Sequence, residues 1–167
     1  MIRQQVGDVL EIHFEDKYYY IVILTKIVMF GGNIIFAFYG NGKRKTFEDL
    51  TNSKKGFNVC TDIILAKREG LVERIGKVDN VEKFFKTKYL RGIFIDKEGK
   101  PYGYWWIYHI SDLRKHVTKV KRLTGKYKNA RDQVTYPFPT VAHMIMNNYK
   151  PNNKNYLYPD DFGISAT

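Results

Sequence analysis

The sequence predicts an α+β fold: a mostly antiparallel, strongly bent β-sheet or small barrel, followed by two C-terminal helices. Aromatic residues, which favour strands, make up 16% of the 167 residues. Apolar segments of strand length alternate with polar turns up to residue 109, and a helical spacing of apolar residues begins only beyond it. We expect a single domain over residues 1–167, β-rich in 6–109 and helical or irregular in 111–167.

The first strands are predicted from the apolar pattern near the N-terminus. Residues 9–14 alternate between two sides, as in a strand with two different faces. Residues 18–30 form a nearly continuous apolar and β-branched run, which is typical of a strand buried on both faces. The turn-forming residues 31–33 and the apolar segment 34–39 then predict a hairpin.

Shorter elements are expected in the middle of the chain. Thr46 and Asp49 have the spacing of a capping pair, which predicts a short helical turn after Thr46. We expect strands at residues 57–66 and 72–78, and a short helix at 81–85.

A second hairpin is the clearest feature of the pattern, with strands at residues 89–95 and 102–109 around a polar turn. Trp105 and Trp106 are adjacent in the second strand, so their side chains must point to opposite faces. We expect both in the core. An exposed aromatic side chain beside basic residues would instead form a binding platform for bases or for a protein.

Two helices are expected after the second hairpin. The first begins at Ser111, a good N-cap, and ends at Gly125, and the second covers residues 140–149. The apolar stripe of the first helix consists of Leu113, Val117 and Val120.

Positive charge is concentrated in the second half of the chain. The net charge is +11, of which residues 1–85 contribute +2 and residues 86–167 contribute +9. Residues 114–131 alone contain eight Lys or Arg and no acid. This asymmetry indicates an acidic or polyanionic partner.

Several classes of site lack support in the sequence. Cys60 is the one cysteine, so no internal disulfide forms, and its place in an apolar strand predicts a buried, inert thiol. The four histidines do not have metal-ligand spacing, and the carboxylates form no convergent pair. The N-terminus has no secretory pattern, and no apolar run is long enough for a membrane span. We therefore expect a cytoplasmic protein without cofactor, metal, catalytic residues or membrane partner.

Three segments resemble a known family. They are Val6-Gly7-Asp8-Val9-Leu10-Glu11-Ile12, then Asp62-Ile63-Ile64-Leu65, then Glu73-Arg74-Ile75-Gly76. In this order, with an aromatic-rich second strand between the first two, they resemble the immunity protein 26 family of bacterial polymorphic toxin systems. The resemblance covers roughly the first half of the chain. It implies a small cytoplasmic protein that binds and neutralises one cognate toxin domain, such as a cytosol-acting nuclease, one-to-one and without catalysis.

The basic residues after the second hairpin are the candidate toxin-binding site. A positive face would attract an acidic partner and speed association, whereas the alternative is a solvated helix face that only aids solubility. Two other functions stay open: a small basic nucleic-acid-binding module, and a hydrolase or transferase that uses His109 or His116. The candidate toxin-binding residues are Arg114, Lys115, Lys119, Arg122, Lys126, Lys128 and Arg131.

Overall fold

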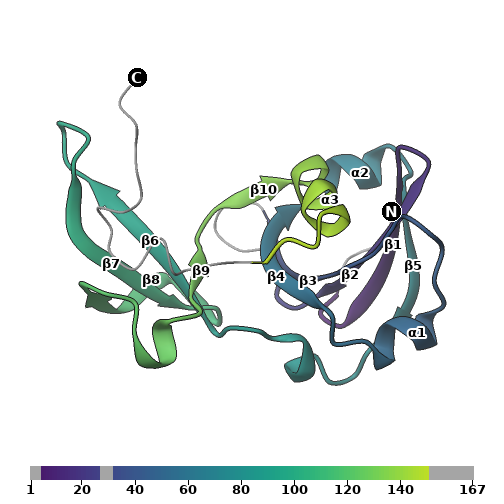
Figure 1. The fold of residues 1–167 in the computed structure, drawn as a ribbon, viewed down its shortest axis with the longest axis horizontal. Helices are drawn as coiled ribbons and strands as arrows, with labels where there is room; N and C mark the ends of the chain where they lie inside the picture. The colour runs from purple at the N-terminus through teal and green to yellow at the C-terminus, as the bar shows by residue number, and fades with distance from the viewer. Residues whose placement is uncertain (1–4, 27–31, 151–167) are drawn as a thin grey trace. The chain divides into compact units, whose positions relative to one another are not determined.

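The computed structural model describes residues 5–26 and 32–150, which form strands in two sheets and a few helices (Figure 1). The predicted α+β class is confirmed, but the sheets are not closed into a barrel. The described residues divide into two compact units, one formed by residues up to 86 together with 134–150 and the other by residues 87–133. The expectation of a single domain stays a prediction. No helix in the described part of the chain is long and apolar enough to cross a membrane.

The first unit contains a six-stranded sheet in the order β10-β4-β3-β2-β1-β5. Its strand pairs are antiparallel except for β10 with β4, which is parallel. The strands are β1 (Asp8–Phe14), β2 (Lys17–Ile23), β3 (Asn33–Phe38), β4 (Gly56–Asp62), β5 (Val72–Lys77) and β10 (Thr135–Pro137).

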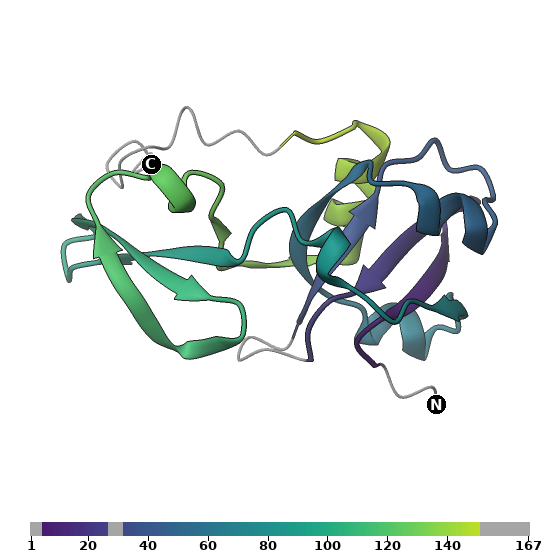
Figure 2. The same cartoon turned by 90° about the horizontal axis from the view of Figure 1, so that it is seen from below.

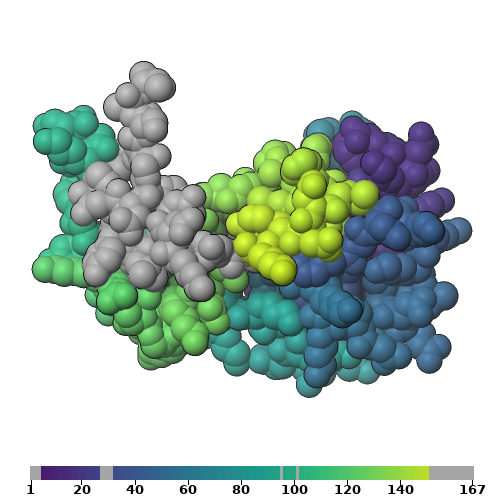
Figure 3. All heavy atoms as spheres, in the orientation of Figure 1, coloured from purple at the N-terminus to yellow at the C-terminus, as the bar shows by residue number. Residues whose placement is uncertain are grey.

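Strand β2 is buried on both faces, as its continuous apolar run predicts. One face carries Ile21, which packs in a core with α3 (Phe138–Met146). Figure 3 shows this helix, in yellow-green, on the surface of the first unit. The opposite face of the sheet carries Phe36, whose ring lies 5.2 Å from that of Phe84 in η1 (Glu82–Phe84). The predicted extension of this strand over 27–30 lies outside the described residues.

The predicted capped turn after Thr46 is the helix α1 (Phe47–Asn52). The Thr46 hydroxyl accepts a hydrogen bond from the Asp49 backbone N–H, and the Thr46 backbone N–H donates to the Asp49 carboxylate. The Thr46 hydroxyl also donates to this carboxylate, at 2.7 Å, and these hydrogen bonds lower the pKa of Asp49. The two residues therefore form a capping box.

The strand predicted over 57–66 is too long. β4 ends at Asp62, whose carboxylate accepts a hydrogen bond from the Ile64 backbone N–H at 2.8 Å. This local bond turns the chain into α2 (Ile64–Arg68), because an Asp side chain offers the backbone an alternative to the sheet ladder. The strand predicted at 72–78 and the short helix at 81–85 are confirmed as β5 and η1.

The second unit contains a four-stranded sheet in the order β8-β7-β6-β9 (Figure 2). The predicted hairpin is confirmed, and Asp96 stabilises its turn by accepting hydrogen bonds from the backbone N–H groups of Glu98 and Lys100. Trp105 is 1% exposed in the core of this unit, whereas Trp106 is only half-buried on the other face. The elements are β6 (Tyr89–Ile95), β7 (Pro101–His109), β8 (Asp112–Val120), η2 (Gly125–Tyr127) and β9 (Arg131–Asp132).

The helix predicted from Ser111 to Gly125 is wrong, because most of this segment is the strand β8. β8 pairs antiparallel with β7, and two irregularities in the register interrupt the alternation of its side chains. As a result, Leu113, Val117 and Val120 have the sequence spacing of an apolar stripe on a helix. Val117, placed on the packed stripe by the prediction, is 54% exposed. Of the two predicted C-terminal helices, only the second, α3, is present.

A buried ion pair holds β9 beside β6. Arg91 on β6 is 3% exposed, and its Nε lies 2.7 Å from a carboxylate oxygen of Asp132 on β9. The Arg91 guanidinium also lies 4.6 Å from the ring centre of Trp105. Through Arg91, Asp132, which follows the last residue of the basic segment, is therefore linked to the core that contains Trp105.

Candidate functional site

The seven predicted basic residues do not form one surface. Arg114, Lys115 and Lys119 lie along β8, and Arg131 lies on β9 at the opposite edge of the sheet. The remaining three, Arg122, Lys126 and Lys128, lie in and around η2. All but Arg131 are exposed, and Arg131 is half-buried.

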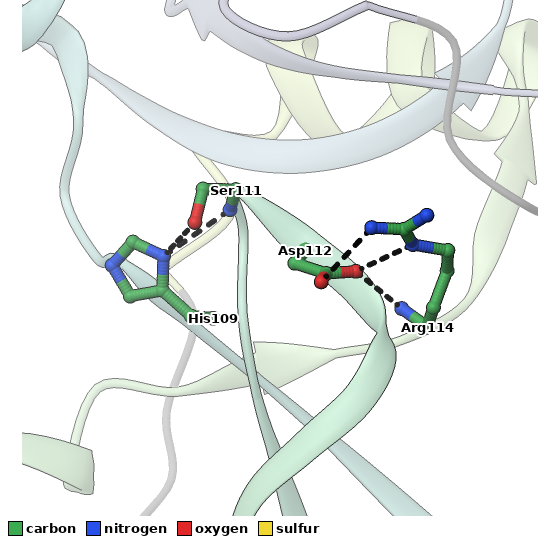
Figure 4. A network of polar contacts seen from close by, with 4 residues as sticks. All are labelled: His109, Ser111, Asp112 and Arg114. Atoms are coloured by element: carbon green, nitrogen blue, oxygen red, sulfur yellow. Dashed lines mark hydrogen bonds and ion pairs between the residues drawn. The ribbon is translucent and has the colours of Figure 1, made fainter.

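Arg114 is held by a local ion pair. Its Nε lies 3.0 Å from a carboxylate oxygen of Asp112, and its backbone N–H donates to the same carboxylate (Figure 4). These contacts lower the pKa of Asp112, and the same pair raises that of Arg114. Both side chains are exposed, so the pair contributes little to stability.

Lys126 lies against aromatic rings of a different cluster. Its ammonium group lies 5.1 Å from the ring centre of Tyr127 and 5.9 Å from that of Tyr89. Interaction with the Tyr127 hydroxyl, and to a lesser extent with Tyr89, raises the pKa of Lys126. These tyrosines pack on the core that contains Trp105, on the sheet face opposite Trp106.

Lys119, by contrast, lies in an aromatic and basic cluster on the other face. Trp106 on β7 is directly opposite Lys119 on β8, and Tyr108 is opposite His116. We call this surface the aromatic–basic face. It consists of Phe94, Tyr104, Trp106, His116, Lys119 and Lys121.

The centre of the aromatic–basic face is the indole of Trp106. The Lys119 ammonium lies 3.8 Å from the ring centre of Trp106, well within cation–π range. The rings of His116 and Phe94 lie 4.5 Å and 4.6 Å from the indole. Three neighbours on the two strands that flank β7 thus fix the orientation of one large aromatic side chain.

The exposed rings of Phe94 and Tyr104 make this face apolar as well as basic. Phe94 is 44% exposed and Tyr104 is 40% exposed, and the Lys121 ammonium lies 5.7 Å from the ring centre of Tyr104. No sequence pattern singles out Phe94 or Lys121. Their relation to Trp106 depends on which residues pair across the strands, and a helix predicted over residues 111–125 has no such pairing.

The charge of this unit is strongly positive. Residues 87–133 contain twelve Lys or Arg and four Asp or Glu, a net charge of +8. Three of the four carboxylates have partners elsewhere: Asp96 in the hairpin turn, Asp112 with Arg114, and Asp132 with Arg91. Lys119 and Lys121 instead place their ammonium groups over aromatic rings.

His109 is one of the two histidines considered for catalysis, and the predicted N-cap residue Ser111 lies close to it. The Ser111 hydroxyl lies 2.6 Å from Nδ1 of His109, and the Ser111 backbone N–H donates to the same nitrogen at 3.2 Å (Figure 4). The neighbouring carboxylate, Asp112, is bound to Arg114 and does not orient the imidazole. The pair therefore resembles a turn-stabilising contact between strands β7 and β8. The other histidine considered, His116, packs edge-on against Trp106.

A second polar cluster lies in the first unit. Glu11 is buried on β1, and one of its carboxylate oxygens accepts a hydrogen bond from the Tyr20 hydroxyl at 2.8 Å. Arg44 donates to the other oxygen at 3.2 Å, and the Lys45 backbone N–H donates to the Tyr20 hydroxyl at 2.8 Å. Burial raises the pKa of Tyr20 to about 12. This network fastens the loop before α1 to the sheet.

Metal and thiol sites find no support in the part of the chain that the structure describes. It contains no group of three His, Cys, Asp or Glu side chains placed to hold a metal ion. Cys60 is buried on β4, as predicted, and its burial raises the pKa of the thiol. A raised pKa keeps the thiol protonated and therefore a poor nucleophile.

Comparison of the chain with protein-family models, curated proteins and solved structures gave no match.

Proposed function

We propose that the protein is an immunity protein that neutralises a cognate toxin domain in the cytoplasm by one-to-one binding, without catalysis. The observation that carries this proposal is the aromatic–basic face. Tryptophan is among the residues that most often dominate binding energy at protein interfaces, and it does so where neighbouring contacts exclude water. Trp106 is such a residue, because Phe94, His116 and Lys119 surround its indole.

The proposal also draws on the resemblance to the immunity family, and two of the three segments that carry it lie side by side in the first unit. The first segment is on β1 and the third is on β5, and these strands are neighbours. Asp8 of the first segment is fully buried, and its carboxylate lies 3.0 Å from Nε of Arg74 in the third. Segments that are more than sixty residues apart in the sequence therefore form one structural feature.

The contact surface that we propose differs from the sequence prediction. Of the seven predicted residues, Lys119 alone belongs to the aromatic–basic face, and Lys121 replaces the others as its second cation. A standard interface of about 1,600 Å² centred on such a cluster supports nanomolar affinity, about −12 kcal/mol. We expect Lys119 and Lys121 to steer an acidic partner and Trp106 to supply most of the binding energy.

Nucleic-acid binding is the second candidate, and the net charge of +8 in residues 87–133 favours it. Exposed rings beside lysines are the elements of a platform for single-stranded nucleic acid. Such binding weakens steeply with salt, so an electrophoretic shift of labelled RNA at two salt concentrations measures it directly.

The proposed function predicts that a toxin domain is encoded beside this chain, and it is tested with that domain. Cells that express the toxin domain should grow when the chain is co-expressed, and the two proteins should co-purify as a 1:1 complex with nanomolar affinity. Unrelated toxin domains should remain lethal. Failure to protect against the neighbouring toxin, or protection against unrelated ones, would refute the proposal.

A further inference from the structure

We infer that the partner binds the aromatic–basic face through an extended acidic segment whose carboxylates are two residues apart. This inference rests on the proposed function and adds the chemistry of the partner. It follows from the positions of two ammonium groups, from what already covers the rings, and from the charges nearby.

The two lysines define the spacing. Lys119 lies over Trp106, and Lys121 lies over Tyr104. The two lysines are two positions apart in the sequence, and so are the two aromatic residues. Trp106 and Tyr104 are alternate residues of β7, so their rings, and the two ammonium groups over them, lie on the same side of the sheet. The backbone repeat between two alternate residues of a strand is about 6.6 Å. An extended acidic segment has the same repeat, so two carboxylates at alternate positions reach both lysines together.

The groups that surround Trp106 favour a carboxylate over a nucleobase as the group that binds here. A base needs an open ring face on which to stack. The Lys119 ammonium, 3.8 Å from the ring centre, already occupies one face of Trp106, and Phe94 and His116 pack against the same indole. A base that stacked on this face of Trp106 would have to displace Lys119 and lose its cation–π contact. A carboxylate approaches the ammonium from the side away from the ring and leaves that contact intact.

The local charges also favour an acidic protein segment. The carboxylates of Asp96, Asp112 and Asp132 are held by other groups of the second unit, so they do not compete for the two lysines. The exposed parts of Phe94 and Tyr104 beside them offer apolar contact. A protein segment supplies both carboxylates and apolar side chains, which matches this combination.

The test uses short peptides, so it does not require the toxin. The first peptide is acetyl-Thr-Thr-Glu-Thr-Glu-Thr-Thr-amide, with its two Glu at alternate positions. The second, acetyl-Thr-Thr-Glu-Glu-Thr-Thr-Thr-amide, has the same composition and charge with its two Glu adjacent, so in an extended segment they point to opposite sides. Each is titrated into the full ¹⁵N-labelled chain, and the backbone amides of Lys119 and Lys121 and the indole N–H of Trp106 are followed by NMR.

We expect the alternating peptide to bind at least fivefold more tightly than the adjacent one and to shift those three signals. Lys119→Ala and Lys121→Ala should each abolish the preference. The matched control is Lys97→Ala, which removes the same charge from the exposed hairpin turn of the same unit. It should leave the preference unchanged. All three positions are exposed, so the spectra of the variants should otherwise match that of the wild type.

Equal affinities for the two peptides, or shifts elsewhere in the second unit, would overturn the inference. An octamer of uridylate that binds more tightly than the alternating peptide, with loss of binding in Phe94→Ala and Tyr104→Ala, would also overturn it and favour nucleic acid. Toxin neutralisation is measured separately. Protection without peptide preference refutes this inference alone, and peptide preference without protection refutes the proposed function.

Discussion

Removing one hydroxyl from the first unit should destabilise it measurably. In Tyr20→Phe, the carboxylate of Glu11 loses a donor at 2.8 Å, and the Lys45 backbone N–H loses its acceptor at 2.8 Å. A hydrogen bond to a charged group contributes about 1.5–3 kcal/mol and a neutral one about 0.5–1.5 kcal/mol. Tyr20 and Glu11 are both buried, so water does not replace the first bond. We expect the free energy of unfolding to fall by about 2–4 kcal/mol.

The neighbouring Tyr19→Phe is the matched control. Tyr19 and Tyr20 are each 3% exposed on the same strand, but Tyr19 faces the other core, where its ring lies 5.8 Å from that of Phe138. Among the described residues its hydroxyl binds no charged group, so its loss should cost less than about 1 kcal/mol.

The assay is urea unfolding followed by far-UV circular dichroism. Both tryptophans belong to residues 87–133, so their fluorescence reports the second unit, and backbone dichroism is needed to follow the first. A shift of the midpoint at constant slope measures the change in stability. If Tyr20→Phe shifts the midpoint no more than Tyr19→Phe does, the buried network does not stabilise the fold as we describe.

Three further predictions concern the fold. The pKa of Tyr20 is raised to about 12 from its ordinary value of 10.0, so its contribution to stability should be lost as the pH rises through this interval; the midpoint difference between wild type and Tyr20→Phe should therefore shrink from pH 10 to pH 12. Asp132→Ala removes a carboxylate from the buried Arg91 and should cost about 3 kcal/mol, measured by tryptophan fluorescence during urea unfolding; an unchanged midpoint would contradict the importance of this pair. Gly56→Ala should cost about 1–3 kcal/mol by the dichroism assay, because the new Cβ would clash with the backbone carbonyl of Ala37; a neutral effect would show that the strand relaxes.

The strands of the first unit and the second hairpin could be predicted because their apolar patterns are local. The continuous run that contains Tyr20 predicted a strand buried on both faces, and Thr46 with Asp49 predicted a capped helix. The division of the sequence into two sheets could not be predicted in this way. It depends on β10 returning to pair with β4 from more than seventy residues away, and no local pattern encodes that pairing.

The candidate site shows the same limit. The basic segment and the opposite directions of Trp105 and Trp106 could be read from the sequence. The partner of Trp106 could not, because a helical interpretation of residues 111–124 placed Lys119 on a solvent face. Two register irregularities in β8 leave its apolar residues at a helical spacing, which predicted a helix although the β-branched residues of this segment favour a strand.

The most direct test of our account is the affinity of interface variants for the cognate toxin domain, measured by calorimetry. The central claim is that the aromatic–basic face binds the toxin. We therefore expect Lys119→Glu and Phe94→Ala each to weaken binding by at least tenfold, about 1.4 kcal/mol. Lys97→Glu, the matched charge reversal in the hairpin turn, should change the affinity by less than about twofold, roughly 0.4 kcal/mol. Equal affinities for the wild type, Lys119→Glu and Phe94→Ala would contradict the claim that this face binds the toxin.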